Sequence, residues 1–76
     1  MSIKVEAVIK SWDSSKDTGL VSITRKFIGD CAFYPGGSFE FSSIFYRGKF
    51  PNTGPEVGQR VHAIFQDCCL TEIRPR

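Results

Sequence analysis

Apolar and polar residues alternate at the start of the chain. The segment Ile3–Ala7 has a period of two, which is typical of a half-buried β-strand. The alternation slips at Val8, where two apolar residues are adjacent. A β-bulge at this point would keep Ile9 on the inner face while Lys10 and Trp12 point outward. We therefore expect a first strand with one irregularity before its end.

The stretch Val8–Ile23 predicts a β-hairpin. The polar segment Asp13–Gly19 separates two segments rich in β-branched residues, which favour extended backbone. Asp, Ser and Gly in that polar segment allow the chain to reverse. Lys10, Trp12 and Lys16 would then lie close to the turn. Two cations beside an aromatic ring supply what a single-stranded nucleic acid needs, namely charge for phosphates and a flat surface for a base.

The rest of the chain continues as short strands separated by turn signals. The expected strands are Leu20–Lys26, Cys31–Tyr34, Phe39–Phe41, Gln59–Gln66 and Leu70–Ile73. Between and after them we expect turns at 28–30 and at 35–38, a helical turn at 42–46, a loop over 47–55 and a frayed basic end at 74–76. In Gln59–Gln66, alternation places Val61, Ala63 and Phe65 on one face and Arg60, His62 and Ile64 on the other.

No segment shows a sustained apolar period of 3.6 residues. Several short strands divided by Gly and Pro turns in one small chain predict an all-β fold, a small five-stranded OB-like β-barrel. The length of 76 residues leaves room for one hydrophobic core, so residues 1–76 are expected to form a single domain.

The succession of these features resembles the cold-shock domain, a five-stranded OB-fold barrel. The resemblance covers nearly the whole chain in the right order. The residues that carry it are Val8-Ile9-Lys10, Trp12, Lys16, Gly19, Ile23-Thr24, Asp30, Phe33, Phe41-Ser42-Ser43-Ile44 and Glu56-Val57-Gly58-Gln59-Arg60-Val61.

The chain departs from the family in both RNA-binding motifs. The first strand of the family has a pattern that resembles K-W-F-N. This chain has Lys10-Ser11-Trp12-Asp13 there, so its tryptophan is displaced by one position. The first motif, Lys16–Ile23, lacks both stacking phenylalanines. The second is split between Cys31–Tyr34 and Phe39–Phe41, so its histidine becomes Tyr34 or Glu40. The resemblance implies binding of single-stranded RNA or DNA with weak sequence preference.

The expected nucleic-acid face comes from the first three strands. Its candidate residues are Lys10, Trp12, Lys16, Leu20 or Ser22, Phe33 or Tyr34, with Arg60 and His62 at the border of the groove. Lysines would hold phosphates, while Trp12 and Tyr34 would stack on bases. Two alternatives stay open. Trp12 could instead close one end of the barrel with its indole N–H at the rim. The cations Lys10, Lys16, Arg25, Lys26, Lys49 and Arg60 could be scattered rather than gathered on one face.

Aromatic residues are too numerous for so small a barrel to bury all of them. We expect Phe39 and Phe41 in the core and the neighbours Phe33 and Tyr34 on opposite faces. The surplus motivates a second hypothesis, that of a protein-interaction or self-associating module. Its contacts would be made by Phe45, Tyr46 and Phe50.

Composition narrows the class of protein. A hydrophobic content of 41% with 13% aromatic residues is typical of a folded domain, and a net charge of +2 permits polyanion binding. No apolar run approaches the length of a membrane span, and the first residues do not resemble a signal peptide. Three cysteines, two of them adjacent, make a poor disulfide framework. We expect free thiols and a cytoplasmic location.

Residues capable of metal binding or catalysis are few. His62 and the cysteines at 31, 68 and 69 lack the paired short spacings of structural zinc sites, so small apolar thiols and a strand-surface histidine are expected instead of a metal site. His62 has no nucleophile or carboxylate pattern beside it, and no Gly-rich phosphate loop is present. We expect no cofactor and a protein that is not an enzyme.

Overall fold

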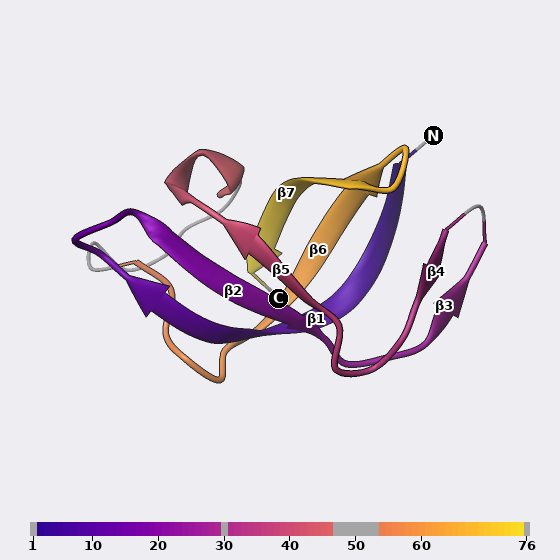
Figure 1. Cartoon of the computed structure of the whole chain (residues 1–76), viewed down its shortest axis with the longest axis horizontal. Helices are drawn as coiled ribbons and strands as arrows, with labels where there is room; N and C mark the ends of the chain where they lie inside the picture. The colour runs from indigo at the N-terminus through magenta and orange to yellow at the C-terminus, as the bar shows by residue number, and fades with distance from the viewer. Residues whose placement is uncertain (1, 30, 47–53, 76) are drawn as a thin grey trace.

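The fold is all-β. The computed structural model describes residues 2–29, 31–46 and 54–75 (Figure 1). Its elements in chain order are β1 (Ser2–Asp13), β2 (Thr18–Ile23), β3 (Phe27–Ile28), β4 (Ala32–Phe33), β5 (Ser38–Phe41), the 3-10 turn η1 (Ser43–Phe45), β6 (Arg60–Gln66) and β7 (Cys69–Pro75). No helix in the described part of the chain is long and apolar enough to cross a membrane.

Five strands form one antiparallel sheet in the order β5-β2-β1-β6-β7. The sheet curls into a half-barrel, while β3 and β4 form a separate two-stranded sheet that projects to one side (Figure 1). A single parallel bridge between Tyr46 and Ile73 connects the segment after η1 to β7. The predicted all-β, five-stranded OB-like architecture is confirmed.

The core lies inside the curl because alternating side chains on each strand face inward. The fully buried core residues are Val5, Ala7 and Ile9 of β1, Val21 and Ile23 of β2, Phe33, Phe41, the β6 residues Val61, Ala63 and Phe65, and Ile73. The expected division of β6 into an inner and an outer face is therefore confirmed, as is the inward direction of Phe41. Phe39 is half-buried against the same core.

One irregularity interrupts the pairing of β1 with β2, between Ile9 and Ser11. It comes one residue later than expected, and Ile9 stays inside as predicted. Because Lys10 is the extra residue, Ser11 pairs with Leu20 on the outer face and Trp12 pairs with Gly19 on the inner face. The expectation that Trp12 points outward is wrong.

Element boundaries differ from the expected ones by one or two residues at several strand starts, a strand at Phe27–Ile28 was not expected, and the larger differences are the following. β2 ends at Ile23 rather than at Lys26, and the third expected strand shrinks to Ala32–Phe33 in the separate hairpin. β7 runs through Pro75, which pairs with Val61, so the predicted frayed end begins too early. The helical turn is confirmed as Ser43–Phe45. Most of the expected 47–55 loop lies outside the described residues.

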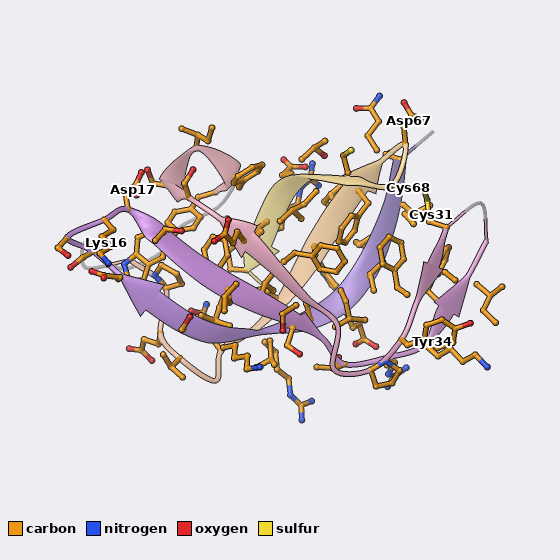
Figure 2. All side chains as sticks on the ribbon, viewed as in Figure 1. Lys16, Asp17, Cys31, Tyr34, Asp67 and Cys68 are labelled. Carbon is orange, nitrogen blue, oxygen red and sulfur yellow. A yellow bond between two sulfur atoms is a disulfide. The ribbon has the colours of Figure 1, made fainter. Side chains whose placement is uncertain are left out.

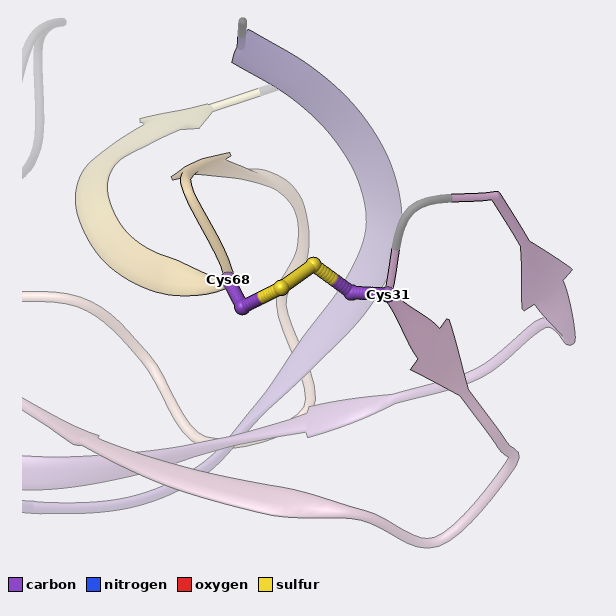
Figure 3. The surroundings of a disulfide bond; sticks show 2 residues. All are labelled: Cys31 and Cys68. Atoms are coloured by element: carbon purple, nitrogen blue, oxygen red, sulfur yellow. A yellow bond between two sulfur atoms is a disulfide. The ribbon is translucent and has the colours of Figure 1, made fainter.

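A disulfide joins Cys31 to Cys68 (Figure 3). The expectation of free thiols is therefore wrong for these two cysteines and holds only for Cys69, which is exposed. The sequence pattern missed the pair because 37 residues separate its members and because the adjacent cysteines obscured it. Only the fold brings the β3–β4 tip next to the β6–β7 turn. The cytoplasmic location, which depended in part on free thiols, stays a prediction without that support.

Replacing both cysteines, as in Cys31→Ser with Cys68→Ser, is expected to lower the free energy of unfolding. Loop-closure entropy for a cross-link across 37 residues predicts a loss of about 4 kcal/mol at most. A domain of this length has about 4–11 kcal/mol in total, so the change is large. Urea denaturation followed by circular dichroism measures it. The matched control is Cys69→Ser, and equal midpoints for the two variants would contradict the expectation.

Candidate functional site

The outer face of the sheet carries several of the expected site residues in adjacent rows. Ser22 and Arg60 lie on either side of Val8, since β2 and β6 both pair with β1 there. His62 lies across from Glu6 in the next row, and Leu20 lies across from Ser11 in the row on the other side. Lys10 is exposed at the bulge. The structure thus brings together Lys10, Leu20, Ser22, Arg60 and His62.

Trp12 is not part of this outer face. Its indole stacks on Phe41, with ring centroids 5.5 Å apart, and tilts against Tyr46 at 5.6 Å. The indole fits because Gly19, directly across the strand pair, has no side chain. A Cβ at Gly19 would lie 2.8 Å from the indole and 3.0 Å from Phe41. Trp12 therefore closes one end of the barrel. This is the alternative to the base-stacking role that the sequence left open.

The indole N–H is buried rather than at a wet rim. Among the described residues it has no hydrogen-bond partner. Gly54 packs against this nitrogen, so closely that a side chain at Gly54 would collide with the indole. Burial, with a further effect of the Asp17 charge, also raises the pKa of Tyr46 above its ordinary value. The Trp12 indole and the uncharged Tyr46 side chain thus close this end of the barrel.

The tip of the β1–β2 hairpin is polar and slightly acidic. Asp13 accepts hydrogen bonds from the backbone N–H and the hydroxyl of Ser15, which lower the pKa of the Asp13 carboxyl. Asp17 accepts two hydrogen bonds from Ser43, one from the backbone N–H and one from the hydroxyl. Lys16 is exposed between these carboxylates. The surroundings of Lys16 are unfavourable for a phosphate because two negative charges flank one positive charge.

Phe33 and Tyr34 face opposite ways, as expected. Phe33 is 6% exposed and packs on Phe65 with ring centroids 4.4 Å apart, so it is a core residue and not a surface for a base. Tyr34 is 55% exposed. The Lys26 ammonium lies over its ring, 5.7 Å from the centroid, which is a cation–π contact. Figure 2 shows Tyr34 at the opposite end of the molecule from Lys16.

A groove of about 460 Å³ lies on the outer surface. One of the residues that line it, Arg25, directly precedes Lys26 in the chain. Its walls include Glu6, Val8, Thr24, Arg25, Gly58 and Arg60. The Nε of Arg25 donates to the Glu6 carboxylate at 2.6 Å, which fixes the guanidinium at the groove. A guanidinium has five N–H donors, so this ion pair leaves donors for an anion. The groove holds two guanidinium groups against one carboxylate.

Arg25 and Lys26 were counted among the cations of the sequence but not placed in the expected site. The pairing register explains why they belong there. Phe27 pairs with Phe33, so Lys26 and Tyr34 flank that pair at the base of the β3–β4 hairpin. The adjacent Arg25-Lys26 pair was the signal available in the sequence, but the expected strand Leu20–Lys26 included both residues, whereas β2 ends at Ile23.

Two of the three aromatic residues proposed for self-association, Phe45 and Tyr46, are turned toward the core. Phe45 and Tyr46 are half-buried and pack against the core, and Phe50 lies outside the described residues. In the described ranges no three His, Cys, Asp or Glu side chains gather in a way that could hold a metal ion. Cys31 and Cys68 are bonded to each other. The self-association hypothesis stays a prediction.

Comparison with known proteins adds no relative: no family model, no curated protein and no solved structure matches this chain.

Replacing Trp12 by Ala is expected to destabilise the fold, because the indole fills the end of the barrel against Phe41 and Tyr46. Removing a large aromatic side chain from such a position costs about 3 kcal/mol. Urea unfolding followed by circular dichroism is the measurement. Lys16→Ala, on the exposed hairpin tip, is the control and should change the midpoint little. An unchanged midpoint for Trp12→Ala would show that the indole does not pack as described.

Proposed function

We propose that this chain is a binding module for single-stranded RNA or DNA rather than an enzyme, and that the ligand lies along the groove of Arg25 and Arg60 and over Tyr34. The observation that carries the proposal is the exposed Tyr34 ring with Lys26 beside it, next in the chain to Arg25 of the groove. This order puts an aromatic surface for a base directly beside cations for the phosphates.

The phosphate part of the proposal depends on three cations. Arg25 and Arg60 line the groove, and Lys26, next to Arg25 in the chain, lies over the ring of Tyr34. Arg25 pairs with Glu6 while its side chain stays 79% exposed, so its remaining N–H donors are accessible to an anion. Guanidinium groups suit phosphate because their planar forks donate two parallel hydrogen bonds. His62 and Ser22 lie in the rows beside Arg60 and would border the bound strand.

The base-stacking part depends on Tyr34. Its ring is 55% exposed at the base of the β3–β4 hairpin, directly after the Phe33 that pairs with Phe27. Lys26 is also exposed and can shift along the ring when a base stacks there. A curled, five-stranded antiparallel sheet agrees with the OB-like barrel that the resemblance to cold-shock domains implies. In this proposal Tyr34 keeps the stacking role that the sequence assigned to it, and Trp12, which was expected to share that role, does not stack on a base.

Tyr34→Ala is expected to weaken binding of a short single-stranded oligonucleotide without unfolding the protein. Stacking of one base on an aromatic side chain corresponds to an affinity loss of about 5- to 100-fold. Fluorescence anisotropy of a labelled oligonucleotide, in RNA and DNA form, gives the dissociation constants. Lys16→Ala should bind like the original chain. Equal affinities of Tyr34→Ala and the original chain would refute the stacking role of Tyr34.

Salt should weaken binding to the degree that three phosphate contacts predict. For single strands the slope of log K against log salt is about −0.7 per contact, so affinity should fall by about 20-fold between about 50 and about 200 mM salt. Arg60→Ala should reduce the magnitude of the slope by about 0.7. Lys16→Ala removes the same charge at the far end of the molecule. If both variants had the original slope, the ligand would not lie in the groove.

A further inference from the structure

The Cys31–Cys68 disulfide joins two parts of the molecule that belong to different sheets. Cys31 precedes β4 at the tip of the β3–β4 hairpin, and Cys68 lies in the turn between β6 and β7 (Figure 3). The hairpin has two-residue strands, and a ladder so short is marginal by itself. The covalent bond therefore holds an element that its own backbone pairing holds only weakly.

Other contacts hold the base and middle of the hairpin but not its tip. At the base, Ile23 bonds to Gly37 and Gly36 bonds to Ile23 through the backbone. In the middle, Phe33 packs on Phe65. On the other face of the hairpin, Ile28 is 65% exposed. Among the described residues the disulfide is thus the attachment of the tip to the rest of the fold, and opening it leaves the backbone hydrogen bonds between Ile23 and residues 36 and 37 in place.

The turn that holds Cys68 is built in a way that favours reaction there. Gln66 and Cys69 pair across a two-residue turn, and Asp67 and Cys68 have φ values of 52° and 67°. This left-handed conformation at both positions favours Asn-Gly, and a cysteine in it is unusual. Cys68 is also exposed, whereas Cys31 is half-buried. Exposed or strained disulfides are the ones that exchange readily with thiols.

We propose that Cys68 is a thiol-exchange site for low-molecular-weight thiols, and that opening it loosens the β3–β4 hairpin. The thiolate of the small thiol attacks the Cys68 sulfur. A new mixed disulfide forms at Cys68, the Cys31–Cys68 bond breaks, and Cys31 leaves as a thiolate that takes up a proton. A second small thiol then attacks the mixed disulfide. The products are two protein thiols and one small-molecule disulfide, so the two electrons come from the two small thiols.

The hairpin connects this chemistry to the candidate site, and this second step rests on the proposed function. Lys26 precedes β3 and Tyr34 follows β4, so their contact depends on the Phe27–Phe33 pair of the ladder. When the tip is free, the two-residue ladder opens from that end, which loosens the Phe27–Phe33 pair and with it the contact of Lys26 with Tyr34. Oxidised protein then presents the cation–aromatic pair beside the groove, and reduced protein presents it less often.

Hydrogen exchange of the oxidised and reduced full chain tests the first step. Reduction with glutathione is expected to lower amide protection at residues 27–29 and 31–34 by at least about tenfold, while β1, β2 and β6 keep theirs. Intact-mass analysis after brief exposure should show one glutathione adduct, and peptide mapping should place it on Cys68. The background variant is Cys69→Ser, which excludes exchange through the neighbouring thiol.

Three results would overturn the inference. These are unchanged protection in the hairpin, loss of protection throughout the sheet, and an adduct that stays on Cys31. The variant Cys31→Ser with Cys68→Ser should reproduce the reduced pattern. If this variant does not fold, reduced original chain still decides the question, because its exchange is measured directly.

Oligonucleotide anisotropy on the same samples separates the exchange site from the proposed function. Reduction is expected to raise the dissociation constant by about fivefold, which is the lower bound for losing one stacked base. If the hairpin opens but oxidised protein binds no oligonucleotide, the proposed function fails and the exchange site stands. If oxidised and reduced protein bind equally well while the hairpin opens, the control of binding fails and the function stands.

Discussion

The facing of side chains along β1 depends on a single extra residue at Lys10. Up to Ile9 the strand alternates in register with β2, and after the bulge the same alternation resumes shifted by one position. A shift by one residue exchanges the two faces of a strand completely. The shift turns Trp12 inward, where it lies over Gly19 and against Phe41. Without it, the indole would point into solvent and the end of the barrel would lack its plug.

The inward Trp12 argues against the nucleic-acid site expected near the β1–β2 turn. The aromatic and cationic residues near the β1–β2 turn do not form a joint surface, because the ring is used for packing and Lys16 lies between two carboxylates. At the other end of the sheet, Arg25 and Arg60 share a groove and Lys26 lies over an exposed Tyr34. The local balance of charges is therefore more favourable for an anionic ligand at this end than at the β1–β2 turn, although the chain carries a net charge of only +2.

The disulfide connects the hairpin that carries Tyr34 to the main sheet. The chain places Tyr34 on a short hairpin outside the main sheet, and the tip of that hairpin is bonded to the β6–β7 turn. In a small domain the core alone gives limited stability, so a cross-link between distant segments contributes a large share. The proposed site and the expected stability of the fold thus involve the same bond.

The sequence by itself determined the strands of the five-stranded sheet to within a few residues, the inner residues of β6, the turn at Ser43–Phe45 and the opposite facing of Phe33 and Tyr34, because alternation and turn chemistry are local properties. Tertiary structure alone decided the facing of Trp12, the joining of Cys31 to Cys68 and the groove of Arg25 and Arg60. Each of these depends on which residue of another strand lies opposite. Pairing across the fold joins residues that are distant in the chain, and neither spacing nor composition records that pairing.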